Sequence, residues 1–167
     1  CFITKEAMES CYVSNKTSEI TYIFPLYVLK ENTFLENRIP NLNTPIIEHI
    51  ARLIDLAYEE EKSGDPDAFA PIDLLDYIYA VLHSPSYRET YKEFLREDFP
   101  RVPYPKDKEQ FRALAALGAE LRRVHLFEHT QIDNLITEFP AAGDGVVEFV
   151  KYDKGKVRIN GRQFFDK

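Results

Sequence analysis

The 167-residue chain has only two cysteines, Cys1 and Cys11. They make neither a disulfide framework nor a metal-binding spacing, which is typical of a reducing, cytoplasmic environment. No apolar run approaches the roughly 18 residues of a membrane span. The first residues carry charges and no long apolar region, so we expect no signal peptide. Because the chain begins at Cys1 rather than Met, we interpret it as a piece of a longer protein.

Catalytic motifs are also missing. The sequence contains no Gly-rich phosphate loop, Gly-x-Ser-x-Gly elbow, Walker lysine or Asn-Pro-Pro-Tyr methyltransferase motif. His125 and His129 have the spacing of metal ligands on a helix, but no third ligand lies nearby in sequence. Glu60 and Lys62, with Asp55 upstream, match only part of a nuclease signature and are read as a solvated helix end. We therefore predict no catalytic residue, no metal and no cofactor in this chain.

Positive charge is outnumbered, since 21 Lys and Arg residues against 28 Asp and Glu residues give a formal net charge of −7. DNA-binding domains are usually basic, so composition alone argues against nucleic acid. The charge is nevertheless uneven. Acidic residues gather at 59–61 and 65–76, whereas the segment 151–167 is basic.

The clearest structural pattern is the stretch 71–105. Apolar residues at helical spacing follow Pro71, which suits a first helical turn. Ser84 and Pro85 are expected to end this helix and to start another. Closely spaced prolines from 100 to 105 then predict an extended strap. Nothing in the stretch looks catalytic, so we interpret it as a scaffold.

The other elements are predicted from periodicity and capping. The segment 20–29 is rich in β-branched and aromatic residues and favours a strand. We expect a loop over 30–43 after this strand. Thr44-Pro45 opens an amphipathic helix that ends within 59–62. Asp107 caps a helix from 108 to about 127. Its buried side chains are expected to be Phe111, Leu114, Leu117, Leu121 and Val124.

Near the end of the chain, two alternating segments, 146–152 and 156–160, bracket a glycine turn and predict a hairpin. The sum is an α+β fold, with about four helices packed with a small antiparallel sheet of N- and C-terminal strands. We expect one domain over 1–167, made of strands and loop (1–43), a helical core (44–127) and the hairpin and tail (144–165).

Polar residues of the types that contact bases and phosphates form three clusters. One lies in the turn before the first strand, one in the loop after it, and one on the hairpin and tail. The candidate DNA-binding residues are Asn15, Lys16, Thr17, Arg38, Asn41, Asn43, Lys154, Lys156, Arg158, Asn160 and Arg162.

Several motifs in order carry a resemblance to a known family. They are Ser14-Asn15-Lys16-Thr17-Ser18-Glu19, Phe24-Pro25-Leu26-Tyr27, Pro40-Asn41-Leu42-Asn43, Asp76-Tyr77-Ile78-Tyr79-Ala80-Val81-Leu82-His83-Ser84-Pro85-Ser86-Tyr87-Arg88 and Asp98-Phe99-Pro100-Arg101-Val102-Pro103. The chain resembles the C-terminal specificity region of type ISP restriction-modification enzymes and related large adenine-specific DNA methyltransferases. The likeness covers nearly the whole chain.

The resemblance implies a non-catalytic target recognition domain that reads double-stranded DNA. A methyltransferase domain that binds S-adenosylmethionine would lie upstream in the same polypeptide. The target recognition domain would have that methyltransferase domain and a coupler domain as its partners, and the whole protein would be cytoplasmic. Two alternatives stay open: a helical module that docks onto those domains without reading bases, and an independent enzyme.

Overall fold

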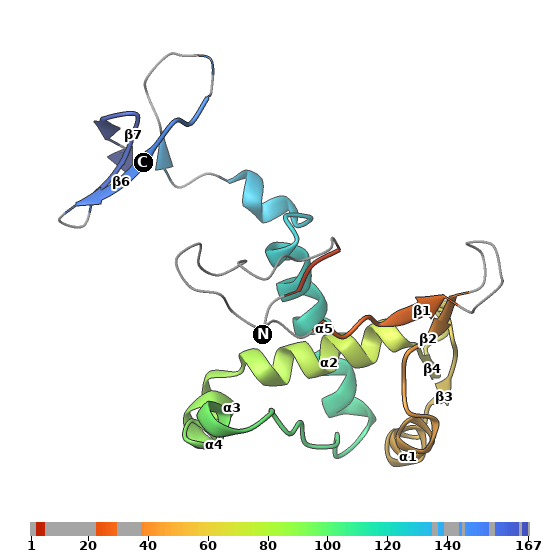
Figure 1. Cartoon of the computed structure of the whole chain (residues 1–167). Helices are drawn as coiled ribbons and strands as arrows, with labels where there is room; N and C mark the ends of the chain where they lie inside the picture. The colour runs from red at the N-terminus through yellow and green to blue at the C-terminus, as the bar shows by residue number, and fades with distance from the viewer. Residues whose placement is uncertain are drawn as a thin grey trace. The chain divides into compact units, whose positions relative to one another are not determined.

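The computed structural model describes residues 3–5, 23–29, 38–134, 137–138, 144, 146–153, 156–163 and 165–166. The chain divides into two compact units, unit 1 (residues 1–128) and unit 2 (residues 129–167), each described by itself (Figure 1). The predicted helical core ends at residue 127, one residue before this division. A single-domain organisation stays a prediction.

Unit 1 contains five α-helices and two small sheets among its described residues. In chain order its elements are β1 (Tyr27–Leu29), β2 (Arg38–Pro40), α1 (Thr44–Ile54), β3 (Ala57–Tyr58), β4 (Ala68–Phe69), α2 (Pro71–His83), α3 (Pro85–Thr90), α4 (Phe94–Glu97) and α5 (Lys108–His125). Strands β1 and β2 pair antiparallel, and β3 and β4 pair parallel.

The described part of unit 2 contains a short 3-10 helix and five strands. They are η1 (Thr130–Asp133), β5 (Thr137–Glu138), β6 (Val150–Asp153), β7 (Lys156–Ile159), β8 (Arg162–Gln163) and β9 (Phe165–Asp166). Strand β5 pairs with β9, and β6, β7 and β8 form an antiparallel sheet in that order.

The α+β class is confirmed, but the strands are organised differently from the expected single sheet. Among the described residues, β1 pairs only with β2, and the strands of unit 2 pair only with one another. Short connections between neighbouring strands cost less chain entropy than a sheet that joins distant parts of the sequence. Local pairing therefore replaces a sheet shared by the two ends of the chain.

Helix α2 lies at the centre of unit 1, where α5 crosses it in close contact (Figure 1). Gly118 makes this approach possible, because a Cβ at this position would lie 1.8 Å from the backbone oxygen of Asp76. Phe111, Ala115 and Gly118 are the buried residues of α5. The expected burial of Leu117 and Val124 is wrong, since they are 60% and 36% exposed; the small residues of the helix face α2 instead.

The core beside this contact is aromatic. Phe111 is fully buried, with its ring centre 5.5 Å from those of Phe69 and Tyr77. Ile54 completes the packing from α1. This helix ends at Ile54, earlier than expected, because Asp55 adopts a left-handed conformation with φ 51° and the chain continues into β3.

The proline strap after α4 is fastened by two tyrosine hydroxyls. Tyr77 of α2 donates to the carbonyl of Pro103 at 2.9 Å, and Tyr87 of α3 donates to that of Arg101 at 2.8 Å. Ser84 separates the two helices and accepts a hydrogen bond from the N–H of Tyr87. The conspicuous motif of α2 and α3 therefore works as a scaffold.

Candidate nucleic-acid interface

The predicted hairpin is present as β6 and β7, and β8 extends it to a sheet of three strands. The register pairs Lys151 with Arg158 and Asp153 with Lys156. Directly paired residues lie on the same face of a sheet, and so do residues two apart. Lys151, Lys156 and Arg158 therefore share one face with the position of Asp153.

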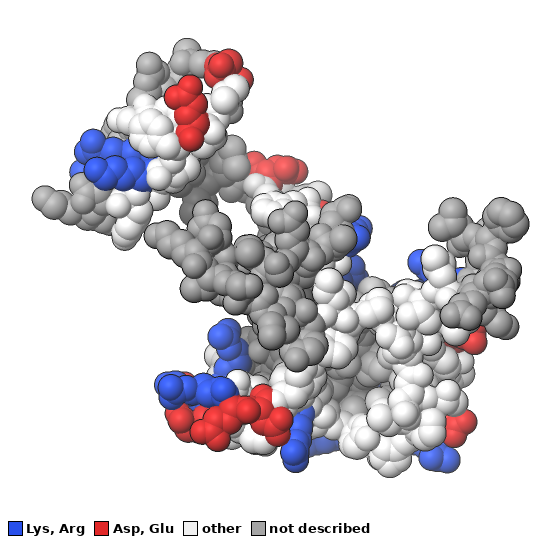
Figure 2. Space-filling model, viewed as in Figure 1, with Lys and Arg blue, Asp and Glu red and all other residues white. Residues whose placement is uncertain are grey.

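This basic face consists of three exposed cations, Lys151, Lys156 and Arg158, against one acidic position. Figure 2 shows Lys and Arg side chains gathered over the hairpin. The opposite face carries Val150, Tyr152, Val157 and Ile159. The β6–β7 hairpin thus has a cationic face and an apolar face, and the cationic one can contact phosphates or base edges.

Asn160 has a structural role in this sheet. It has φ 48° and is followed by Gly161 with φ 78°, so the pair forms the two-residue turn between β7 and β8. Its side-chain oxygen accepts from the N–H groups of Glu148 and Phe149, and its amide donates to the carbonyl of Val146 at 2.8 Å. The Asn-Gly pair is a hairpin signal that the sequence interpretation missed.

Arg38 lies at the start of β2 and is held on two sides. Its Nε and Nη2 donate to the two carboxylate oxygens of Glu61, each at 2.9 Å. Its guanidinium carbon lies 4.3 Å from the centre of the Tyr27 ring. The hydrogen bonds to Glu61 raise the pKa of Arg38 further above its usual value. The side chain stays 53% exposed, so it is oriented but accessible.

Asn41 and Asn43 stabilise the backbone of unit 1. The side-chain amide of Asn41 donates to the carbonyl of Pro25 at 3.0 Å. Asn43 is the N-cap of α1, and its side-chain oxygen accepts from the N–H of Ile46. These contacts give both residues a structural role, and DNA binding by them stays a prediction.

The remaining candidates can be placed only in part. Asn15, Lys16, Thr17 and Lys154 lie outside the described residues. Arg162 is the first residue of β8 and pairs with Ile159. The register therefore puts position 162 on the face opposite to Arg158.

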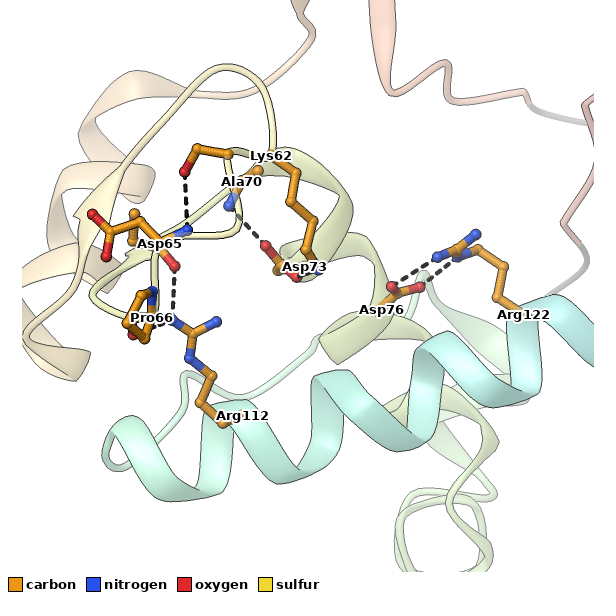
Figure 3. Close-up of polar contacts among 10 residues, drawn as sticks. Lys62, Asp65, Pro66, Ala70, Asp73, Asp76, Arg112 and Arg122 are labelled. Carbon is orange, nitrogen blue, oxygen red and sulfur yellow. Dashed lines mark hydrogen bonds and ion pairs between the residues drawn. The ribbon is translucent and has the colours of Figure 1, made fainter.

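The acidic residues of α2 are paired with cations or backbone (Figure 3). Asp73 accepts from Lys62 at 2.6 Å and from the N–H of Ala70 at 3.0 Å. Asp76 is 3% exposed and accepts two hydrogen bonds from Arg122, at 2.6 and 3.0 Å. The two carboxylates point to different partners, so they form no paired acid–base site.

The two histidines at helical spacing do not converge on one point. His125 Nδ1 lies 2.5 Å from the hydroxyl of Tyr79, whereas His129 accepts from the N–H of Gln131 at the start of η1. Within the described ranges, no three His, Cys, Asp or Glu side chains are grouped to hold a metal ion. No helix of this part is long and apolar enough to cross a bilayer.

One comparison with known proteins gives a match. The family model described as the type ISP C-terminal specificity domain matches residues 1–167, the whole chain. No curated protein and no solved structure matches the chain.

Proposed function

Since the chain belongs to the type ISP C-terminal specificity domain family, we propose that it recognises a specific site in double-stranded DNA for an N6-adenine methyltransferase. Membership of this specificity-domain family supports a target recognition role in restriction enzymes. The finer proposal is that the chain binds the duplex from the major groove and positions it for a catalytic domain elsewhere in the same polypeptide.

The exposed basic face of β6–β8 is the observation that carries the proposal. A two-stranded ribbon fits the major groove of B-DNA. Lys151, Lys156 and Arg158 present their cations on one side of such a ribbon. Side chains of these types grip phosphates and donate to the guanine edge.

The net charge of −7 is compatible with this proposal. Many acidic groups of unit 1 are neutralised by direct partners, as Asp73 is by Lys62 and Asp76 by Arg122. Fields of exposed charges fall off over about 10 Å at 0.1 M salt, so a local basic face can act despite the overall charge. Other domains of the polypeptide would supply further phosphate contacts.

We propose no catalytic residue in this chain. Adenine methylation and the binding of S-adenosylmethionine belong to an upstream methyltransferase domain. That domain and a coupler domain would be the intramolecular partners, within the cytoplasm. The chain's own contribution is to bind and orient the duplex.

The test is a DNA-binding titration of the complete protein at several salt concentrations, with Lys151, Lys156 and Arg158 all changed to Ala. Each lost phosphate contact lowers the slope of log K against log salt by about 0.9, so three lost contacts lower it by about 2.7. The matched control changes Lys92, Arg96 and Arg101 to Ala. These exposed cations of unit 1 are each paired with an acid, and their removal changes the net charge equally.

A reduced slope for the sheet variant and an unchanged slope for the control are expected. Equal slopes for both variants and the unmodified protein would remove the basic face from the proposal.

A docking role is the second candidate, and the apolar face of the same sheet favours it. Val150 is 61% exposed and Tyr152 is 72% exposed. Exposed apolar patches commonly mark contacts with another domain. Changing Val150 and Tyr152 to Ser would then loosen the attachment to the methyltransferase domain, seen as faster proteolytic separation of the domains. Unchanged proteolysis would exclude this role.

A further inference from the structure

The exposed guanidinium of Arg38 is held in one orientation by more contacts than a stabilising surface ion pair needs. Exposed ion pairs contribute little to the stability of a fold. Arg38 and Glu61 are 53% and 58% exposed, yet both carboxylate oxygens are engaged and an aromatic ring lies under the guanidinium. The arrangement therefore fixes a direction more than it stabilises the fold.

Three segments cooperate to fix this direction. Arg38 begins β2, and Tyr27 lies in the paired strand β1, two residues from Leu29, the direct partner of Arg38. Glu61 comes from the loop after β3, and the Tyr27 hydroxyl donates to the carbonyl of Glu60 at 3.5 Å. The Tyr27 ring sets the position of the guanidinium plane, and Glu61 sets its rotation within that plane.

The hydrogen-bond inventory shows what remains available. A guanidinium has five N–H groups. Glu61 takes one from Nε and one from Nη2. Both N–H groups of Nη1 and the second of Nη2 are left, and no other hydrogen bond from Arg38 is found within the described ranges. The free groups form the end-on pair, which matches two neighbouring acceptors.

Guanine presents such a pair, N7 and O6, at its major-groove edge. A phosphate also has two acceptors, but the carboxylate of Glu61 lies beside the guanidinium and repels a second anion. The pair as a whole is close to neutral, so its contact with DNA gains little from counterion release. Neutral guanine is therefore the better match.

On the basis of the proposed function, we propose that Arg38 reads one guanine through its end-on N–H pair, with Glu61 and Tyr27 as positioning residues. Holding the side chain in advance spares part of the rotamer entropy that a free arginine loses on binding. A well-placed bidentate contact discriminates against other bases by about 5- to 150-fold in affinity.

The first experiment selects duplexes from a randomised pool with the complete protein and with its Arg38→Ala, Arg38→Lys and Glu61→Gln variants. Arg38→Ala and Arg38→Lys should lose the preference for guanine at one position and keep the rest of the selected sequence. Arg38→Lys retains the charge without the planar fork, so it separates readout from charge. Glu61→Gln should weaken the preference at that same position.

The matched control is Arg101→Ala. Arg101 is also an exposed arginine with an acidic partner, Asp98 at 3.5 Å, and an aromatic neighbour, Phe94 at 5.2 Å, but it lacks the bidentate arrangement. Its variant should select the same sequence as the unmodified protein. Thermal unfolding of every variant establishes that it is folded.

The second experiment replaces the guanine at that position by 7-deazaguanine, which lacks N7. The unmodified protein should lose affinity, by at most the roughly 5- to 150-fold that a complete bidentate contact contributes, because O6 remains. Arg38→Ala should bind the two duplexes equally. If Arg38→Ala instead loses the same affinity on every duplex and has a lower salt slope than the unmodified protein, Arg38 contacts a phosphate and the inference is overturned. If the Arg38 variants select the same sequence as the unmodified protein, Arg38 and Glu61 form only a surface ion pair and the inference is wrong. If the sheet variant also binds normally, the proposed function itself fails.

Discussion

Adding a single methyl group at Gly118 tests the packing of α5 on α2. In Gly118→Ala the new Cβ would lie 1.8 Å from the backbone oxygen of Asp76, whereas approaches below 3.0 Å are essentially never seen. The oxygen belongs to the helix backbone and cannot swing aside. The two helices must therefore separate by about 1 Å or bend.

The expected cost follows from two opposing effects. Alanine stabilises a helix by about 1 kcal/mol relative to glycine. Overpacking costs about 1–3 kcal/mol, and the upper end applies because separation also disturbs the buried pair of Asp76 and Arg122. The net result is a destabilisation of about 2 kcal/mol. For a chain of this size, Tm should fall by about 4–8 °C.

Urea unfolding of the chain, followed by far-ultraviolet circular dichroism, measures the effect. Ala116→Gly is the matched control, because Ala116 is exposed in the same helix and its change should cost only about 1 kcal/mol. A Gly118→Ala variant that is as stable as the unmodified chain, or more stable, would refute the described approach of the two helices.

Three further outcomes follow from individual contacts. Asp76→Asn leaves the Arg122 guanidinium without its buried counter-ion, so the free energy of unfolding should fall by about 3 kcal/mol; a loss below about 0.5 kcal/mol in urea titrations would contradict the pairing. Asn160→Ala removes three side-chain hydrogen bonds from a residue at positive φ, so amide hydrogen exchange in β6 and β7 should accelerate, and unchanged exchange would speak against the turn. Burial, and then the charge of His125, lowers the pKa of His83, so the unfolded chain binds more protons than the folded chain below about pH 6.5. The contribution of His83 to stability should therefore be complete above that pH and decline as the pH falls toward the pKa of the folded state. In a plot of Tm against pH, His83→Gln should flatten this decline.

Local signals in the sequence predicted the helices well. Asp107 caps α5 as expected, through the N–H of Gln110 at 2.7 Å. The side-chain oxygen of Gln110 in turn accepts from the N–H of Lys106 at 2.8 Å, just before the cap. Ser84 and Pro85 separate α2 from α3, since a cap and a preset φ act within a few residues. Features that depend only on residues close together in the sequence can therefore be predicted from the sequence.

Features set by packing were harder to predict. Periodicity selected Leu117 for the core, but the contact with α2 favours the smallest side chains, so Ala115 and Gly118 are buried instead. The second turn of the C-terminal sheet was missed although Asn160-Gly161 is a strong hairpin signal. The partner of Arg38 was not predictable, because Glu61 lies 23 residues away and only the folded chain brings them together.

The central claim is that this chain determines which DNA site is recognised. The most direct measurement exchanges residues 1–167 in the complete protein for the corresponding segment of a family member that recognises another site, and then maps methylated adenines across the host genome. The account predicts that the methylated site changes to that of the inserted segment. Methylation that continues at the original site would contradict it.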